Sequence, residues 1–189
     1  MASTWSQDIY INAYRFAAEA HWNSKIKQVV PGTDIPYLMH FSMVSMEVIA
    51  VLEKESDLDG DLAVQCALLH DTIEDTDTTY DQLVEKFGLA VANGVNALTK
   101  DESIGANISK EKKKKIQMTD SLERIRKQPK EIWMVKMADR ITNLQPPPSR
   151  WTQDKISRYR EEASEIYRFL KGGSHHLAAR LEEKIDNYP

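Results

Sequence analysis

The amino-acid sequence predicts an all-α protein, and two observations support this fold class. Apolar residues recur three and four positions apart in most segments between Gly or Pro breaks, which is the period of an amphipathic helix. The alternation of apolar and polar residues that marks a half-buried strand is absent. With 189 residues, no repeat and no linker-like tract, we expect residues 1–189 to form a single domain, a bundle of about eight to nine helices.

Three helices are predicted in the first part of the chain. Segments 6–22 and 38–54 each place a stripe of apolar residues on one face, and a turn containing Pro and Gly separates them. Segment 60–71 is apolar nearly all round, so we expect it to lie at the centre of the bundle. A polar turn at 74–78 follows it.

Helix-capping patterns predict the next two helices. Thr79 with Gln82 three residues later forms a capping-box pattern, which indicates a helix that starts there and runs to Phe87. Gly88 is expected to end this helix, because glycine is the preferred residue just beyond a helix C-terminus. A short helix at 89–99 comes next.

Four helices are predicted in the remaining chain. A loop at 100–109 precedes a highly charged helix, and Pro129 suits the first turn of the helix after it. Three consecutive prolines from Pro146 stop that helix, because proline lacks the backbone donor and clashes with the preceding turn. Thr152 is the expected N-cap of the next one. The predicted ranges are 110–127, 129–144, 152–170 and 175–186.

The composition limits the classes of function and location. Hydrophobic residues make up 41% and charged residues 29%, as in an ordinary globular protein. Cys66 is the only cysteine, so a reducing compartment is expected and a metal site must use His and carboxylate ligands. The net charge of −4 provides no overall attraction to nucleic acid or anionic membranes. Without a signal-peptide pattern or a membrane-length apolar run, we expect a cytoplasmic protein.

Four ionisable residues follow the most apolar segment: His70, Asp71, Glu74 and Asp75. Carboxylates crowded beside a buried helix repel one another unless a cation lies among them. A nitrogen donor from His with oxygen donors from Asp suits Mn, Fe, Zn or Co better than Mg or Ca. On its own, however, this pattern is more typical of a helix that ends in a solvated acidic turn.

Two further residues lie on other predicted helices. His40 lies at the start of the segment 38–54, and Asp139 lies beside the apolar face of the helix that ends near Leu144. A lone His or Asp in such a position is usually a satisfied polar residue. Together with the His70-Asp71 pair they provide nitrogen and oxygen donors from three separate helices, which favours a common role.

The stretches that contain these residues resemble the hydrolase domain of RelA/SpoT-type alarmone enzymes, a branch of the HD superfamily. The resemblance is closest to the stand-alone small alarmone hydrolases, including the metazoan SpoT homologue, and it extends over roughly residues 6 to 170. The run HD-x-x-ED-T-D-T-T is much more specific than the HD pair alone. The stretches are PYLMH (36–40), ALLHDTIEDTDTTYDQL (67–83), FG (87–88), ALTKD (97–101) and VKMADRITNL (135–144).

This resemblance implies an activity, a metal and a set of site residues. The implied enzyme is a metal-dependent 3′-pyrophosphohydrolase of guanosine tetra- or pentaphosphate, in which metal-activated water attacks the 3′-diphosphate. The family's metal is usually manganese. Glu74 and Asp75 occupy the positions of the acidic pair that handles the water, and Asn143 occupies a polar position near the substrate. The family's metal-ligand positions are occupied by His40, His70, Asp71 and Asp139.

The substrate-binding residues depart from the family pattern. Where relatives carry an Arg-Lys pair that packs on the base, this sequence offers Lys25 and Lys27. Lysine lacks the planar guanidinium that stacks on a purine, so adenine alarmones or a nicotinamide dinucleotide phosphate stay open as substrates. Lys136 and Arg140 flank Asp139 and are candidates to bind substrate or to orient this carboxylate; a solvated flank is the alternative.

Two other functions remain open on the sequence. One is a different HD phosphohydrolase, such as a nucleotidase or a nucleoside triphosphatase; the other is a non-catalytic domain that binds a nucleotide. The expected partner is a small guanosine or adenosine polyphosphate, with no nucleic acid and no membrane, and the sequence does not indicate an oligomeric state. Lys112 to Lys115 are interpreted as a solvated helix face, because no aromatic residues alternate with them.

Overall fold

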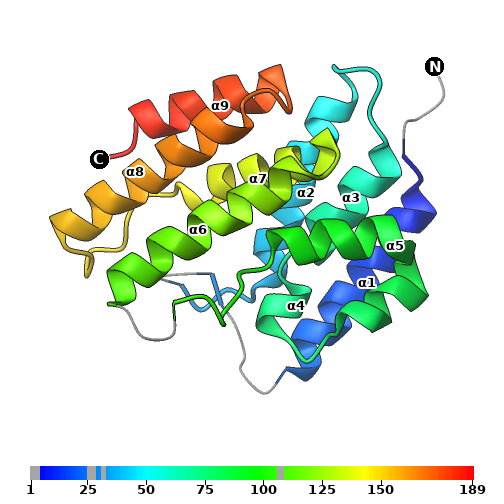
Figure 1. Ribbon diagram of the computed structural model, residues 1–189. Helices are drawn as coiled ribbons and strands as arrows, with labels where there is room; N and C mark the ends of the chain where they lie inside the picture. Colours follow the sequence, from blue (N-terminus) through cyan, green and yellow to red (C-terminus); the bar gives the residue numbers. More distant parts are fainter. Residues whose placement is uncertain (1–4, 25–28, 31–32, 106–108) are drawn as a thin grey trace.

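The computed structural model describes residues 5–24, 29–30, 33–105 and 109–189, and these ranges are helical with short connections (Figure 1). Their only β-pairing is an isolated bridge between Val29 and Pro36. The all-α prediction is confirmed. The helices of the described ranges are α1 (Gln7–Asn23), α2 (Leu38–Leu52), α3 (Gly60–Leu69), α4 (Thr72–Asp75), α5 (Tyr80–Leu98), α6 (Lys110–Arg126), α7 (Lys130–Asn143), α8 (Gln153–Leu170) and α9 (His175–Asp186).

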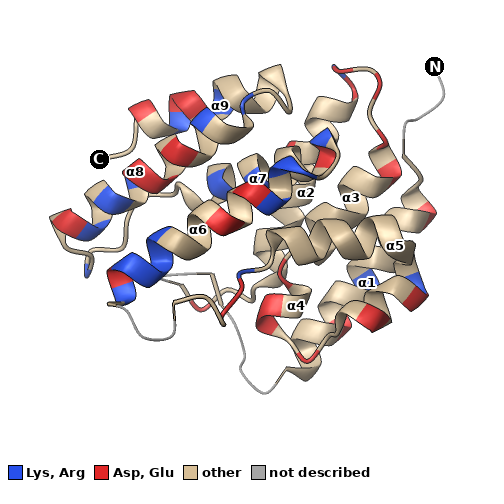
Figure 2. Cartoon of the chain, in the orientation of Figure 1, with Lys and Arg blue, Asp and Glu red and all other residues tan. Residues whose placement is uncertain are grey.

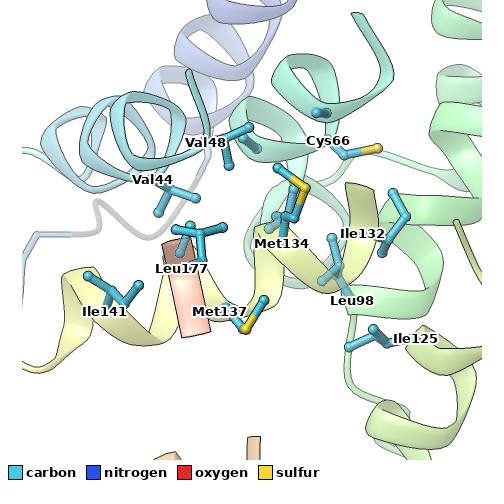
Figure 3. Close-up of a cluster of buried hydrophobic side chains, with 14 of the residues drawn as sticks. Val44, Val48, Cys66, Leu98, Ile125, Ile132, Met134, Met137, Ile141 and Leu177 are labelled. Atoms are coloured by element: carbon cyan, nitrogen blue, oxygen red, sulfur yellow. The ribbon is translucent and has the colours of Figure 1, made fainter. Parts of the chain in front are cut away.

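Helix α3 lies at the centre, as its apolar sequence predicts. It packs against α1, α2, α5 and α7, and most of its side chains are buried. Figure 3 shows the core that α2, α3, α5 and α7 share with α6 and α9. Burying one large aliphatic side chain contributes roughly 1.5–3 kcal/mol, so this core holds the helices firmly against one another. Its labelled members are Val44, Val48, Cys66, Leu98, Ile125, Ile132, Met134, Met137, Ile141 and Leu177.

The capping box predicted at Thr79 is present, with the Thr79 hydroxyl accepting from the Gln82 backbone and the Gln82 side chain accepting from the Thr79 backbone. Gly88 does not separate two helices, however. It forms a kink within α5, with φ of 84° and ψ of 169°. Glycine alone adopts this conformation without steric cost, so the two predicted helices are two arms of one bent element.

The chain breaks between α3 and α4 at His70 and Asp71. We expected the helix to run to residue 71, but α3 ends at Leu69 and a one-turn helix, α4, starts at Thr72. The Thr72 hydroxyl donates to the Leu69 carbonyl at 2.7 Å, which satisfies an acceptor left free by the break. In a regular helix neighbouring side chains point about 100° apart, so this break allows two consecutive residues to face the same point.

Charged residues are frequent along α6, α8 and α9, whereas α3 contains few of them (Figure 2). The first turns of α6 are notably rich in lysine. Among the described residues, no helix has the length and apolar character needed to cross a membrane.

Candidate metal centre

The four side chains predicted as metal ligands lie together. His40 is on the first turn of α2, His70 and Asp71 are at the break after α3, and Asp139 is on the buried face of α7. The Nε2 atoms of the two histidines are 3.2 Å apart. The Asp71 Oδ2 atom lies 2.9 Å from Nε2 of His70 and 3.7 Å from Nε2 of His40. The Asp139 Oδ1 atom lies 3.3 Å from Nε2 of His40 and 4.0 Å from Nε2 of His70.

The hydrogen-bond partner of Nδ1 in each histidine determines the tautomer, and in both it leaves Nε2, which faces the cluster, without a proton. The Nδ1 atom of His70 lies 2.9 Å from the Ala67 carbonyl, an acceptor, so Nδ1 carries the proton. The Thr142 hydroxyl donates to the Asp139 carbonyl and therefore offers a lone pair to Nδ1 of His40 at 3.5 Å. In their neutral forms both histidines thus direct bare Nε2 lone pairs at each other, an arrangement that a cation between them relieves.

The electrostatics of the cluster favour positive charge. Burial opposes a charge on His70, but the carboxylates of Asp71 and Asp139 outweigh it and raise the pKa of this imidazole to about 9. Burial also acts against ionisation of Asp71, yet the neighbouring histidines hold the pKa of its carboxyl below the usual range. Donor atoms of His40, His70 and Asp71 lie within 4.8 Å of one another, and Oδ1 of Asp139 lies 3.3 and 4.0 Å from the two imidazole nitrogens. Nitrogen and oxygen donors grouped in this way fit a divalent transition metal.

Three side chains outside the cluster fix the orientation of its carboxylates. The Tyr37 hydroxyl donates to Oδ2 of Asp71 at 2.6 Å. The Lys136 ammonium pairs with Oδ2 of Asp139 at 3.0 Å, and the Asn143 amide donates to Oδ1 of Asp139 at 2.5 Å. Burial and the nearby Asp71 charge both raise the pKa of Tyr37, so its phenol stays protonated and remains a donor. Carboxylates held in this way bind a metal with little loss of side-chain freedom.

Helical phase explains which neighbours of Asp139 reach it. Lys136 is three residues before Asp139 and Asn143 is four residues after it, so all three share one face of α7. Arg140 is the next residue and points elsewhere. Its guanidinium lies over the Tyr159 ring, 4.4 Å from the centroid, and 3.5 Å from Glu162. The structure therefore brings Lys136 and Asn143 to the cluster but not Arg140.

The remaining predicted residues lie in three places. Glu74 is on α4, next to the cluster, and its carboxylate accepts from Lys100 of the chain segment after α5. Asp75 is on the same turn, and its backbone carbonyl accepts from the Ser24 hydroxyl. Lys25 and Lys27 lie outside the described residues.

Two residues at this centre were not singled out from the sequence, Tyr37 and Lys100. Both lie in stretches that carry the family resemblance, PYLMH and ALTKD. The helical period of the apolar residues does not indicate the contacts that these two side chains make. Tyr37 is the N-cap residue of α2, three positions before His40, so its side chain can reach the same cluster. This proximity within one stretch was the available signal for Tyr37.

A groove of about 1580 Å³ opens beside the cluster. His40, Thr142 and Asn143 line one part of it. Other lining residues come from α6 and α8, where basic and acidic side chains are mixed. Lys114 and Lys115, expected on a solvated helix face, are indeed exposed, and they also line this groove. The groove therefore reaches His40 of the cluster and has lysine residues on one wall.

A helical domain with a buried cluster of this kind, presented by a His-Asp pair at a helix break, defines the class of HD proteins. Residues 13–174 match the HD domain family, and the chain belongs to that family. The matched range includes His40, the His70-Asp71 pair and Asp139, and it covers α2 to α8 completely.

Comparison with known proteins identifies similar chains from animals and bacteria. The chain is 32% identical to the guanosine-3′,5′-bis(diphosphate) 3′-pyrophosphohydrolase MESH1 of Danio rerio, over 95% of this chain and 92% of that protein. It is 30% identical to the human MESH1 of the same name, over 91% and 90% of the two chains. A bacterial protein named guanosine-3′,5′-bis(diphosphate) 3′-pyrophosphohydrolase, from Aquifex aeolicus, is 32% identical over 82% of this chain but only 20% of its own length.

A solved structure supports the same relationship. It is described as a metazoan orthologue of SpoT that hydrolyses ppGpp and plays a role in starvation responses. The two structures superimpose with a TM-score of 0.74 over 96% of each chain, at 26% sequence identity. The helical HD fold of this protein is thus that of the small, stand-alone members.

Proposed function

We propose that this protein is a metal-dependent 3′-pyrophosphohydrolase of guanosine 3′,5′-bis(diphosphate). The observation that carries this proposal is the convergence of His40, His70, Asp71 and Asp139 beside an open groove. The similarity to proteins named for this activity extends over nearly the whole chain, which supports the same reaction here.

The four clustered residues would hold one divalent ion, and we propose manganese as the native metal. A divalent metal in such a site lowers the pKa of water from ~15.7 toward about 7–9 and offsets the negative charge of phosphoryl oxygens. The protein supplies ligands whose orientation is already fixed. Burial acts against ionisation of Asp139, but Lys136 and the imidazoles keep the pKa of its carboxyl well below the usual range. Asp139 therefore stays ionised and ready to bind a cation.

Glu74 and Asp75 are proposed to handle the attacking water. In the reaction, the oxygen of water forms a bond to the phosphorus attached to the ribose 3′-oxygen, and the bond between these two atoms breaks. Glu74 accepts a proton from the water, and the leaving 3′-oxygen is protonated as diphosphate is released. The products are inorganic diphosphate and a nucleoside 5′-diphosphate. Asp75, on the same turn, is proposed to orient the water from the other side.

The groove is large enough for a polyphosphorylated nucleotide and has lysines on one wall. Small-molecule sites usually have volumes of roughly 300–1,000 Å³, and this groove exceeds that range. The whole chain carries a net charge of −4, so attraction of a polyanion depends on local cations. Lys114 and Lys115 are candidates for this attraction, while Lys25, Lys27 and Arg140 remain sequence-based candidates for substrate contacts.

The decisive experiment is incubation of the purified protein with guanosine 3′,5′-bis(diphosphate) and manganese, followed by identification of both products. We expect diphosphate and guanosine 5′-diphosphate, and complete loss of turnover with a chelator. The matching adenosine compound and a nicotinamide dinucleotide phosphate, tested in parallel, define the base preference. Release of monophosphate or triphosphate in place of diphosphate would instead identify another type of HD phosphohydrolase.

The organisation and location of the protein are also proposals. We propose that residues 1–189 act as one domain and that the protein works in the cytoplasm. The single cysteine, Cys66, supports a reducing compartment because the chain cannot form an internal disulfide. Imaging of the tagged protein in intact cells, together with a cytoplasmic marker, tests the location.

A further inference from the structure

Lys100 contacts Glu74 through both its side chain and its backbone. The ammonium of Lys100 lies 2.5 Å from Oε1 of Glu74, and the backbone N–H of Lys100 donates to Oε2 at 3.2 Å. Each oxygen of the Glu74 carboxylate therefore has one donor from the same residue. Since a carboxylate oxygen has two lone pairs, each oxygen keeps one free to accept a proton or a water hydrogen bond.

The backbone of Lys100 is itself well anchored. It follows the C-terminus of α5, where Arg124 of α6 donates to the carbonyls of Asn96, Ala97 and Thr99 at 2.7–3.1 Å. A further bond joins Nε of Arg124 to Asp120, which holds the guanidinium in place. The donors that reach Glu74 thus come from a capped helix end and not from a free loop.

Lys100 keeps its positive charge beside Glu74. Partial burial lowers the pKa of the ammonium, but the charges of Glu74, Asp71 and Asp139 together raise it above the ordinary value. Lys100 is therefore a permanent cation, and its environment includes the carboxylates of the cluster. Half of its side chain is exposed, so its ion pair with Glu74 is not an internal structural bridge.

We propose that Lys100 is a positioning residue for catalysis: it clamps Glu74 so that the free lone pairs of this carboxylate face the attacking water. This inference rests on the proposed function and adds a residue to it. Exposed ion pairs contribute little to folding stability, so the main effect of Lys100 is expected in turnover. Because the ion pair already holds the Glu74 side chain in one rotamer, less side-chain entropy is lost when its carboxylate takes up position for the reaction.

Turnover measurements test the role through Glu74. We expect Lys100→Met to lower kcat roughly 10- to 100-fold with little change in KM, and Lys100→Arg to recover part of the loss. In a Glu74→Ala background, Lys100→Met should have no further effect, because the residue through which it acts is gone. The matched control is Lys113→Met, which removes another lysine–carboxylate pair, that of Lys113 and Glu102, at 2.8 Å. It should leave kcat unchanged.

Two results would overturn the proposal. One is a rise in KM with unchanged kcat in Lys100→Met, which would make Lys100 a direct substrate contact. The other is an equal loss from Lys100→Met in the presence and absence of Glu74, which would make its effect independent of this carboxylate.

A measurement without substrate separates this proposal from the proposed activity. In proton–nitrogen correlation spectra of the free protein, we expect the Lys100 ammonium to exchange slowly with water and to lose this protection in Glu74→Ala but not in Glu102→Ala. An ammonium that exchanges as fast as that of an unpaired surface lysine would exclude the clamp, whatever the protein hydrolyses. Absence of diphosphate release by the wild-type protein, with a protected Lys100 ammonium, would reject the activity and leave the clamp in place.

Discussion

The two sides of the groove are built in opposite ways. On one side His40 is buried on a helix of the core, and Thr142 and Asn143 beside it contact His40 and Asp139 of the cluster. On the other side Lys114 and Lys115 are exposed and contact no carboxylate among the described residues. We therefore expect catalysis to depend on the buried side, where the loss of a single ligand atom changes the rate. We expect attraction of the substrate to depend on the exposed side, where the charges of several lysines add up.

The largest effect is expected from removal of a ligand on the buried side. Asp71→Ala should abolish turnover and weaken metal retention, because it removes an oxygen donor 2.9 Å from Nε2 of His70. Metal content after dialysis and the rate of diphosphate release measure both effects. Asp186→Ala, an exposed aspartate of α9, is the control and should retain both properties. Equal activity of the two variants would remove the basis of the metal assignment.

A smaller but still large loss is expected for Glu74→Ala. The rate should fall by roughly 10²–10⁴-fold, the usual contribution of a general base, while the metal stays bound. Metal content and single-turnover rates distinguish the two roles. Loss of metal in this variant would reassign Glu74 as a ligand.

An intermediate effect is expected for Tyr37→Phe, which removes only the hydroxyl that donates to Asp71 at 2.6 Å. Loss of a partner that orients a metal ligand usually reduces metal affinity or activity by about 10- to 100-fold. Titration of the metal-free protein with manganese provides the affinity. Tyr80→Phe, which removes an exposed hydroxyl bonded to Asn93, is the matched control and should bind manganese normally.

The smallest effect is expected on the exposed side. Lys114→Ala combined with Lys115→Ala should raise KM only a few-fold, with unchanged kcat, because exposed charges each contribute about 0–1 kcal/mol. The increase should shrink at high salt, where exposed charges are screened. Lys112→Ala tests a lysine of the same helix that does not line the groove, and it should leave KM unaltered. A large drop in kcat for the double variant would contradict the division between the two sides.

The sequence predicted the helices well because their apolar periods and caps are local features. The end of α3 at Leu69 lies two residues before the predicted end at residue 71, because sequence patterns place helix ends less exactly than helix centres. The kink at Gly88 was expected as a helix end, because sequence does not distinguish a glycine that terminates a helix from one that bends it.

The grouping of the His and Asp side chains was predicted from their combination on three helices and from the family resemblance of the stretches that contain them. Contacts between distant elements were not predictable in the same way. The clamp of Lys100 on Glu74 joins residues 26 positions apart, and nothing in their local patterns indicates that they meet. Arg140 shows a different limit: proximity in sequence to Asp139 suggested contact, but the helical phase directs its side chain to Tyr159.

The ligand atoms of the cluster come from α2, the end of α3 and α7, which are separated in the chain by dozens of residues but packed together in the core. An ion bound there would tie these three helices together and would be lost on unfolding. Its occupancy therefore adds directly to thermal resistance: above the dissociation constant, each tenfold rise in free ion adds about 1.4 kcal/mol to the free energy of unfolding. The melting temperature of this protein should therefore rise with the concentration of free metal ion in the solution.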